Sequence, residues 1–551
     1  MATGMATETE AEAATEDAAE ARERVVAKQR AAWERVLVGR ERPAFPAPDL
    51  TLKERFNELA QMQPDAPYLV YRDEELSYGA CNERARRFAA ALQRLGCGRG
   101  HRVMLCMANA PDLVLLCHAC FKLGAIVVCT NPLEQRRDLR AKLEDCRPRA
   151  VIADERSYPA LRDLAEELGT AAPCVRLLAS LRVDELPPQP EPVVRLDPDD
   201  VQVLQYTGGT TGVMKGCCHT SRGYLASSAA MAQAFVPVLG AFPARTLVAL
   251  PMGHGSGFTT AVTSPLMAGG SVVLVDALKP SLEDVLAAIE RSRPTVWPTV
   301  PLVINRYISN EELRRRYDLS SVRIVLTGAA PLARDTILRF EELSHARITE
   351  AYGLSEAVNV VTLSPVGRPV AGKVGVPLAN TDVLLVDVRT GRVLDEPGGV
   401  GEIVVRSPSV MKGYWNDPQR TAEQLRDGWL HTGDLGSFDE CGLLQIAGRK
   451  KEVIIVSGFN VYPRDVAEAL LAHPDVAEAH VVGVPDDERG EVPAALVVRA
   501  PGARLTEADL IAFCKRTMTR YKVPRRICFV DALPALGNGK PDGVAMSRWR
   551  F

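Results

Sequence analysis

The stretch Tyr206-Thr-Gly-Gly-Thr-Thr-Gly-Val-Met-Lys-Gly216 brings four glycines, three threonines and one lysine into a single short segment. Glycines let the backbone approach an anion closely and turn its N–H groups toward it. Threonine hydroxyls add hydrogen-bond donors, and Lys215 adds a point charge for phosphate oxygens. A plain surface turn would need the glycines alone, and the spacing is not that of a Walker A motif. The combination predicts a phosphate-binding loop formed by Thr207, Gly208, Gly209, Thr210, Thr211, Gly212 and Lys215.

Outward from this loop, short apolar runs alternate with helical patterns. Strands are expected at 102–107, 125–129, 271–275 and 323–326, and helices at 82–95, 112–123 and 281–291. Strands that alternate with helices favour a mostly parallel sheet covered on both faces. Beyond about residue 380, short strands with turn signals predict a β-rich subdomain, and the residues after Gly448 predict a small α+β unit. The expected fold is therefore α/β, with a large N-terminal domain of layered, mostly parallel sheets.

Composition and charge exclude several classes of protein. Of the 551 residues, 46% are hydrophobic and 25% charged, which is typical of a globular chain. The net charge of −3 gives no global reason to bind nucleic acid or an anionic membrane. The most apolar stretch, 103–129, is interrupted by polar residues, so no membrane span is expected. The N-terminus shows no secretory signal, and the thirteen cysteines indicate reduced thiols in a cytoplasmic protein, with Cys117-x-x-Cys120 as core packing.

The first 45 residues are acidic and rich in alanine, and a Pro-containing stretch, 42–48, separates them from the rest of the chain. A segment of this composition can be helical but has little apolar surface to bury. We therefore expect residues 1–45 to be a disordered arm whose default role is that of a solvated spacer.

The phosphate loop resembles the signature of the adenylate-forming (ANL) superfamily, which includes acyl- and aryl-CoA synthetases, adenylation domains of nonribosomal peptide synthetases and beetle luciferases. The resemblance runs from about Leu52 to Arg550, and further motifs follow in the family's order. These motifs are Pro251–Gly257, Gly328–Leu332, Tyr352-Gly-Leu-Ser-Glu356, His431-Thr-Gly-Asp434, Gly448–Ile454, Ser457–Pro463 and Leu533–Lys540. The order makes the assignment stronger than any single motif, and the fatty-acyl and aryl-CoA ligases resemble this chain most.

The resemblance implies how ATP is bound. Tyr352 would stack on adenine, and the hydroxyl of Ser355, where the family usually has threonine, would touch the α-phosphate. Glu356 would bind Mg²⁺, which fits the hard oxygen ligand that this ion requires. Asp434 would accept hydrogen bonds from both ribose hydroxyls, and Arg449 would also contact the ribose. The remaining members of the predicted ATP site are Gly328, Ala329, Ala330, Ala351, Gly353 and Lys540.

The resemblance also identifies a catalytic lysine and a hinge. Lys540 matches the family's catalytic lysine, where an ammonium stabilises the charge that develops on the α-phosphate. The continuation Pro541-Asp-Gly departs from the usual aliphatic-basic sequence. Lys451 matches the hinge about which the small domain turns. The domains implied are the arm 1–45, an adenylation domain 46–447 and a mobile C-terminal domain 448–551.

The acid-binding side is less defined. His254 matches a histidine that lies near the acid or the thiol tunnel, and we include it among the candidate catalytic residues. No acidic residue stands between Pro251 and Pro265, which disfavours a substrate with an α-ammonium group. The candidate pocket is mostly apolar, as an apolar or aromatic acid would require. It comprises His254, Gly255, Trp297, Gly328 and Leu354.

One departure concerns the positions after the phosphate loop. The family usually has His-x-Asn there, whereas this chain has Ser221 and Gly223, with a histidine at His219 instead. The altered region is compatible with a different helix start or with an unusual acid.

These observations predict a two-step ligase that uses ATP, Mg²⁺ and CoA. A carboxylic acid would be converted to an acyl adenylate with release of pyrophosphate, and CoA would then displace AMP. Transfer to a carrier protein or an amine, activation of nitrous acid, and a non-catalytic ATP-binding regulatory module are the alternatives. The expected partners are a small-molecule acid and CoA or a carrier protein, with the chain a monomer or homodimer.

Overall fold

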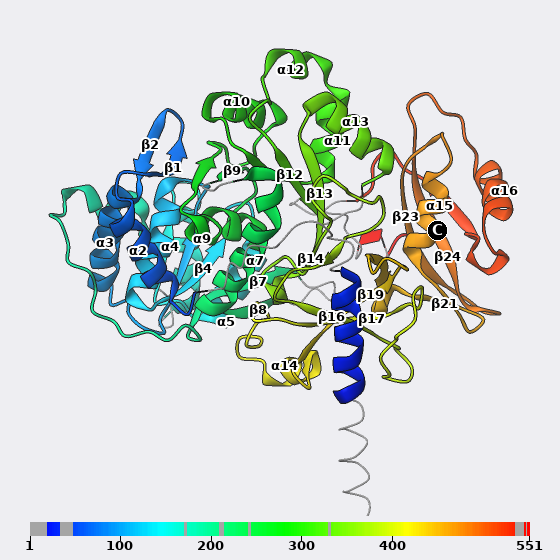
Figure 1. The fold of residues 1–551 in the computed structure, drawn as a ribbon, viewed down its shortest axis with the longest axis horizontal. Coiled ribbons are helices and arrows are strands. Elements are labelled where there is room, and N and C mark those ends of the chain that lie inside the picture. Colours follow the sequence, from blue (N-terminus) through cyan, green and yellow to red (C-terminus); the bar gives the residue numbers. More distant parts are fainter. Residues whose placement is uncertain are drawn as a thin grey trace, which may run out of the picture.

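The computed structural model describes residues 19–33, 48–169, 174–208, 214–240, 244–328, 332–534, 545–546 and 548–550. It confirms the α/β fold: two mostly parallel sheets form the large body, a β-rich unit lies beside them, and a smaller unit holds the C-terminal part (Figure 1). Within the described residues, every helix is too short or too polar to cross a bilayer.

The first sheet has six strands in the order β6-β5-β3-β4-β7-β8. Its strand pairs are parallel except for the antiparallel hairpin of β7 and β8. The strands are β3 (Arg102–Cys106), β4 (Ile126–Thr130), β5 (Ala150–Ala153), β6 (Cys174–Leu177), β7 (Val201–Gly208) and β8 (Met214–Thr220). The helices in this part are α4 (Pro111–Leu123), α5 (Arg136–Cys146), α6 (Tyr158–Leu168) and α7 (Ser221–Leu239). The strands expected at 102–107 and 125–129 and the helix expected at 112–123 are confirmed.

The second sheet has nine strands in the order β15-β14-β13-β12-β11-β9-β10-β1-β2, and its centre is parallel. Its strands are β1 (Pro67–Tyr71), β2 (Glu74–Ser77), β9 (Arg245–Val248), β10 (Ser271–Leu274), β11 (Val296–Thr299), β12 (Ile324–Gly328), β13 (Arg347–Tyr352), β14 (Thr362–Leu363) and β15 (Val376–Pro377). Its helices are α2 (Leu52–Met62), α3 (Tyr78–Arg94), α8 (Gly255–Phe258), α9 (Pro265–Ala268), α10 (Leu282–Ser292), α11 (Pro301–Ser309), α12 (Glu311–Arg316) and α13 (Arg334–Ser344). The helix expected at 82–95 begins earlier, at Tyr78, because Ser77 caps its first turn.

Helices are packed between the two sheets and also outside each of them. Every residue of α4 from Leu113 to Leu123 is buried, because the helix lies in the core shared by β3, β4, β1 and β10. The opposite face of the first sheet packs on α5 and α6, and that of the second sheet on α10, α11 and α13. Cys117 and Cys120 lie in α4 and are buried, as expected for core packing.

The β-rich unit is a five-stranded antiparallel sheet in the order β16-β17-β19-β18, with β20 paired to β19. The elements are β16 (Asp382–Val386), β17 (Gly401–Arg406), α14 (Pro418–Gln424), β18 (Leu425–Arg426), β19 (Trp429–Phe438) and β20 (Leu444–Arg449). One face of this sheet packs toward the large body through Val383, Leu385 and Ile403. The other face carries Leu384, Val404 and Trp429, which are also buried.

A helix over residues 19–33 covers that second face, and it corrects the expectation of a disordered arm for these residues (Figure 1). Val25 and Val26 pack against the strands, and Nε1 of Trp33 donates to the carbonyl oxygen of Gly442 at 2.9 Å. The composition alone did not indicate that this helix packs on the sheet. Its few apolar side chains contact strands that lie far away in the sequence.

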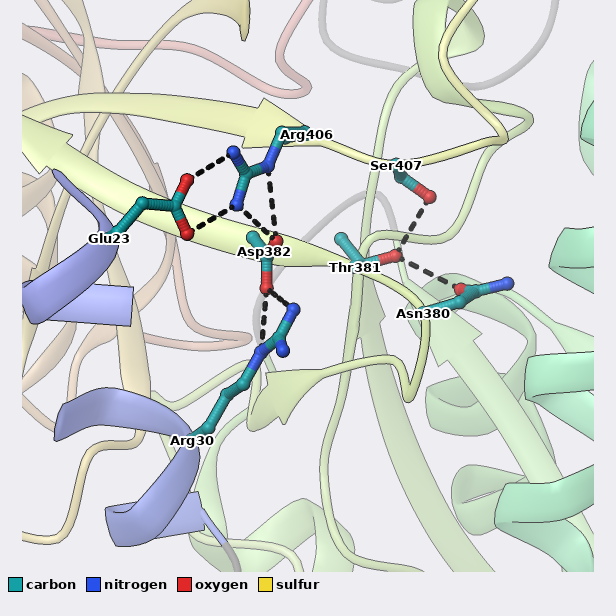
Figure 2. A network of polar contacts seen from close by, with 7 residues as sticks. All are labelled: Glu23, Arg30, Asn380, Thr381, Asp382, Arg406 and Ser407. Atoms are coloured by element: carbon teal, nitrogen blue, oxygen red, sulfur yellow. Dashed lines mark hydrogen bonds and ion pairs between the residues drawn. The ribbon is translucent and has the colours of Figure 1, made fainter. Parts of the chain in front are cut away.

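Ion pairs fasten the same helix to the sheet (Figure 2). Asp382 on β16 is nearly buried, and its two oxygens accept from Arg30 Nε at 2.9 Å and from Arg406 Nη2 at 3.0 Å. Arg406 continues to Glu23, so the chain of charges begins and ends on the helix. The helix is thus held by apolar contacts and by a continuous network of opposite charges.

The C-terminal unit is a second five-stranded sheet, in the order β22-β21-β24-β23, with β25 paired to β24. Its elements are β21 (Ile454–Val456), β22 (Phe459–Val461), α15 (Pro463–Leu471), β23 (Val476–Asp486), β24 (Gly490–Arg499), α16 (Glu507–Thr517) and β25 (Arg526–Phe529). It contacts the β-rich unit through α15, where Arg464 Nη1 donates to the carbonyl oxygen of Ile446 at 2.5 Å.

Candidate active site

Two neighbouring parallel strands end at the same edge of the nine-stranded sheet. Gly328 ends β12 opposite Ala351 of β13, and Tyr352 ends β13. A Cβ on Gly328 would stand 2.7 Å from the carbonyl oxygen of Ala351, so a larger residue would force a backbone shift. Ligands of α/β sheets bind at the carboxyl ends of parallel strands. These predicted ATP-site residues therefore share an edge that suits a ligand.

The turn after Tyr352 folds back tightly on itself. A Cβ on Gly353 would lie 1.7 Å from the carbonyl oxygen of Asn359, so glycine is required there. Val358 and Asn359 both have positive φ, 47° and 71°, which non-glycine residues rarely adopt. Strained backbone of this kind clusters at ligand sites. The turn carries Ser355 and Glu356 in the short 3₁₀ helix η5 (Ser355–Ala357).

An aspartate and an arginine meet the end of β13 from the β-rich unit. The hydroxyl of Tyr352 donates to Asp434 Oδ2 at 2.7 Å, and Arg449 Nε lies 3.4 Å from Asp434 Oδ1. Asp434 and Arg449 face each other in the register of β19 and β20. Burial raises the pKa of Asp434, while the charge of Arg449 acts against that shift. A carboxylate has about four acceptor sites, so Asp434 keeps capacity for a vicinal diol.

The lysine of the phosphate loop approaches the same region from β8. Lys215 lies opposite Thr207 in the β7–β8 hairpin, and its Nζ lies 4.8 Å from the centre of the Tyr414 ring. The hydroxyl of Tyr414 donates to Glu356 Oε1 at 2.8 Å. A tyrosine therefore connects the lysine and the glutamate that were predicted to act on the phosphates and on Mg²⁺.

The residues present fit a magnesium ion held mainly by its substrate. Among the described residues, no group of three or more histidine, cysteine, aspartate or glutamate side chains could form a metal cage. Mg²⁺ in phosphate-transferring sites is commonly bound by one or two carboxylates together with phosphate oxygens and water. The single carboxylate of Glu356, which Tyr414 links to Lys215, matches that donor set.

His219 positions the turn that carries Glu356. Its Nε2 lies 2.7 Å from the carbonyl oxygen of Ser355, and the ring is buried. Because the acceptor is a carbonyl, Nε2 must carry the proton. Burial lowers the pKa of His219 to about 4, so the imidazole is neutral at pH 7. His219, which departs from the family's usual pattern, therefore bonds to the turn that carries Ser355 and Glu356.

Ser221 and Gly223 lie at the start of α7, just after Thr220, whose side chain caps the helix by accepting from the amide of Gly223. The hydroxyl of Ser221 accepts from the backbone N–H of Leu52 at 3.0 Å. A Cβ on Gly223 would stand 3.2 Å from the carbonyl oxygen of Pro408, so the space for a larger side chain is narrow. Both residues thus pack the helix start against its surroundings.

His254, a predicted pocket residue, caps the short helix α8. Its Nδ1 accepts from the amide of Ser256 at 3.3 Å, which assigns the ring proton of a neutral imidazole to Nε2. Asn359 lies against the next residue: a Cβ on Gly255 would come within 2.2 Å of its Oδ1. Gly255 therefore lets the amide of Asn359 approach the beginning of α8.

One member of the candidate pocket lies in the outer core instead. Trp297 has 0% exposed surface and packs beside Phe340 in the core between the sheet and the outer helices. This placement corrects the prediction that Trp297 lines the pocket, because strand alternation turns its ring toward α13. Leu354 is half-buried and packs against the core of the β-rich unit.

Several predicted site residues lie outside the described residues, and they remain sequence predictions. They are Gly209, Thr210, Thr211, Gly212, Ala329, Ala330 and Lys540. Lys451, the predicted hinge, lies in the exposed 3₁₀ turn η6 (Lys450–Glu452) directly after β20.

Sequence reasoning missed Tyr414, and it left the role of His219 open. The only available signal for Tyr414 was an aromatic residue in the run Lys412-Gly-Tyr-Trp415, which carries no pattern of its own.

Comparison with known proteins identifies the family of this chain. A family model described as "AMP-binding enzyme" matches residues 56–415, and one described as "AMP-binding enzyme C-terminal domain" matches residues 465–540. The chain is 33% identical over 535 residues to a long-chain-fatty-acid–CoA ligase of Bacillus subtilis, covering 90% of this chain and 94% of the relative. It is 34% identical over 484 residues to a feruloyl-CoA synthase of an Amycolatopsis species, covering 87% and 95%.

A solved structure with the same fold is that of the amide bond synthetase McbA from Marinactinospora thermotolerans. It has a TM-score of 0.82 and 30% sequence identity, and the match covers 90% of this chain and 99% of the other. With matches to both family models and relatives above 30% identity over most of its length, this chain belongs to the AMP-binding enzyme family of adenylate-forming ligases.

Proposed function

We propose that this chain is an AMP-forming acid–thiol ligase that activates a carboxylic acid with ATP and transfers the acyl group to CoA. One observation carries the proposal: separate segments of the chain bring Tyr352, Asp434 and Arg449 into one cluster, beside the linked side chains of Lys215, Tyr414 and Glu356. The first cluster has the chemistry to hold a ribose, and the second has the chemistry to hold phosphates. Together they suit a nucleoside triphosphate.

In the first step, an oxygen of the acid carboxylate attacks the α-phosphorus of ATP. A P–O bond forms, the bond to the bridging oxygen of the β-phosphate breaks, and pyrophosphate leaves with that electron pair. Lys215 neutralises charge on the phosphates, and Asp434 with Arg449 holds the ribose. Mg²⁺ beside Glu356 would supply positive charge to the same oxygens. Lys540, a candidate from resemblance alone, would stabilise charge at the α-phosphate.

In the second step, the sulfur of CoA attacks the acyl carbon and forms the C–S bond of the thioester. The bond from that carbon to the phosphate oxygen breaks, AMP leaves with the electron pair, and the thiol proton passes to solvent. One cleft cannot present a lysine to ATP and an open path to a thiol at the same time, so the two steps call for different domain positions. We place the domain boundary at 447/448, immediately after which Lys451 would act as the hinge. The similarity to ligases whose names specify CoA supports CoA as the acceptor.

The acid is expected to be apolar or aromatic. The names of the relatives include a fatty-acid ligase and a feruloyl-CoA synthase. No acidic residue stands between Pro251 and Pro265, which argues against an amino acid as the substrate. We place the protein in the cytoplasm, since all thirteen cysteines are free thiols and ten of them are buried. We expect a monomer or a homodimer.

A second candidate function follows from the likeness to the amide bond synthetase, which favours an amine as an alternative acceptor. A panel of fatty and aromatic acids tests both readings, with ATP–pyrophosphate exchange as the readout of the first step. Acid-dependent exchange followed by CoA thioester formation is expected. Exchange that yields an amide but no thioester would favour the amine. Release of ADP in place of AMP, or no exchange with any acid, would overturn the proposed activity.

A further inference from the structure

Glu402 connects two segments that the proposed mechanism uses, although no predicted motif includes it. It lies on β17, and its side chain is 7% exposed. Its Oε1 accepts from the backbone N–H of Gly433 at 3.2 Å. Its Oε2 lies 3.2 Å from Nζ of Lys450 and 3.3 Å from Nδ1 of His431. One carboxylate therefore contacts both the turn before Asp434 and the residue before the predicted hinge.

The segment that Glu402 holds is a bulge in β19. Glu402 pairs with Leu435 and Val404 pairs with His431, so residues 432–434 stand opposite the single residue 403. Gly433 has a φ of 74°, which places it in the left-handed region that glycine tolerates. A bulge beside an active site redirects a side chain. Here the redirected side chain is that of Asp434, which reaches Tyr352 and Arg449.

The negative charge of Glu402 stabilises its contacts with Lys450 and with the amide of Gly433. A buried carboxylate is costly unless cationic or polar groups surround it. Burial alone would raise the pKa of Glu402, but the hydrogen bonds from His431 and Lys450 outweigh that effect and lower the pKa to about 2. The carboxylate is therefore ionised across the working range of pH, and it attracts Lys450 and the amide of Gly433 at the same time.

We propose that Glu402 is a positioning residue that locks the 432–434 bulge and Lys450 into one arrangement, so that Asp434 and Arg449 face the ribose together. The inference rests on the proposed function, because it assigns the ribose to Asp434 and Arg449. Glu402 does not touch the nucleotide in this account. It affects nucleotide binding in two ways. It holds the bulge that carries Asp434, and it holds Lys450, which directly follows Arg449 at the end of β20.

The test is the variant Glu402→Gln, which keeps the shape of the side chain and removes its charge. The apparent KM for ATP should rise about tenfold while kcat changes less than about threefold, because the ribose contact is weakened before chemistry begins. Calorimetry with Mg·ATP should show the same loss of affinity without turnover. The preference for ATP over 3′-deoxy-ATP should shrink, since a misplaced Asp434 gains less from the hydroxyl. Lys450→Gln is a milder change at a more exposed residue. It should shift the KM for ATP, the affinity for Mg·ATP and the preference for ATP over 3′-deoxy-ATP in the same direction by a smaller factor.

Asp382→Asn is the matched control. Asp382 lies in the same sheet, its side chain is 8% exposed, and it is also held by two basic residues, but it contacts neither the bulge nor Lys450. Loss of stability without loss of ribose discrimination is expected from this variant. If Asp382→Asn reduced discrimination as much as Glu402→Gln, or if Glu402→Gln discriminated like the wild type, the positioning role would be overturned. If the wild type itself did not bind Mg·ATP, the proposed function would fail, and this inference with it.

Discussion

The hydroxyl of Tyr414 donates a hydrogen bond of 2.8 Å to Oε1 of Glu356. The tyrosine follows β17 in the chain, whereas the glutamate follows β13, so the contact joins the β-rich unit to the nine-stranded sheet. A hydroxyl in this position restricts the rotamers of the carboxylate before any cation arrives. Tyr414 therefore prepares the proposed magnesium ligand.

Replacing Tyr414 with phenylalanine should weaken magnesium binding and preserve the ring beside Lys215. Loss of one hydrogen bond to the carboxylate should cost about 1 kcal/mol, so the half-saturating Mg²⁺ concentration in pyrophosphate exchange should rise roughly fivefold. A magnesium titration at saturating ATP measures the change. Tyr307→Phe, in the outer helical layer, is the control and should leave the titration unchanged. A lower half-saturating concentration in Tyr414→Phe would show that the hydroxyl competes with the metal instead.

The helix over residues 19–33 should contribute measurably to stability. Trp33 is buried against Phe438 and bonds to Gly442, so Trp33→Ala leaves a cavity and an unpaired carbonyl. We expect the free energy of unfolding to fall by about 3 kcal/mol. Urea unfolding followed by circular dichroism measures it. Lys28→Ala removes only an exposed ion pair with Asp395 and should change the midpoint little. Equal midpoints for both variants and the wild type would mean that the helix adds no stability.

The alternating pattern of strands and helices predicted the layered sheets because local propensity and burial agree there. The strands at 102–106 and 126–130 are apolar except for Arg102 and Thr130 at their ends, as expected for strands of a buried parallel sheet. The same rule, applied to Asp382–Val386 and Gly401–Arg406, would have indicated a sheet covered on both faces. Nothing in the local sequence of residues 19–33 specified that they provide the cover, because the contacts span more than 350 residues.

The order of motifs predicted the family, and the structure brings Tyr352, Asp434 and Arg449 together. Side chains that hold other site residues in place were harder to predict from the sequence. Glu402 and Tyr414 work through a bulge and a long-range hydrogen bond, and neither leaves a periodic signal in the sequence. The prediction that Trp297 lines the pocket fails for a different reason, because strand alternation directs its ring into the core.

Substituting Lys540 with alanine should separate the two proposed half-reactions. Acid-dependent pyrophosphate release should fall by about 100-fold or more, because an ammonium near the α-phosphate stabilises charge that exists only in that transition state. Thioester formation from synthetic acyl adenylate and CoA should persist. Lys522→Ala, at a lysine of the C-terminal unit that pairs with Asp465, serves as the control and should preserve both reactions. Equal loss of the two half-reactions in Lys540→Ala would contradict the assignment.

The buried His219 predicts a specific dependence of stability on pH. Burial lowers its pKa from 6.5 to about 4, so the folded protein keeps the ring neutral while the unfolded chain takes up a proton below pH 6.5. The contribution of the neutral ring to the free energy of unfolding is fully present above pH 6.5. It is lost as the pH falls toward 4, and the total loss is about 3 kcal/mol. His219→Gln keeps a donor for the carbonyl of Ser355 but does not titrate. Urea midpoints of the wild type and the variant should therefore converge, or change order in favour of the variant, between pH 6.5 and 4. A difference between the midpoints that stays constant over this range would show that His219 does not carry the acid sensitivity.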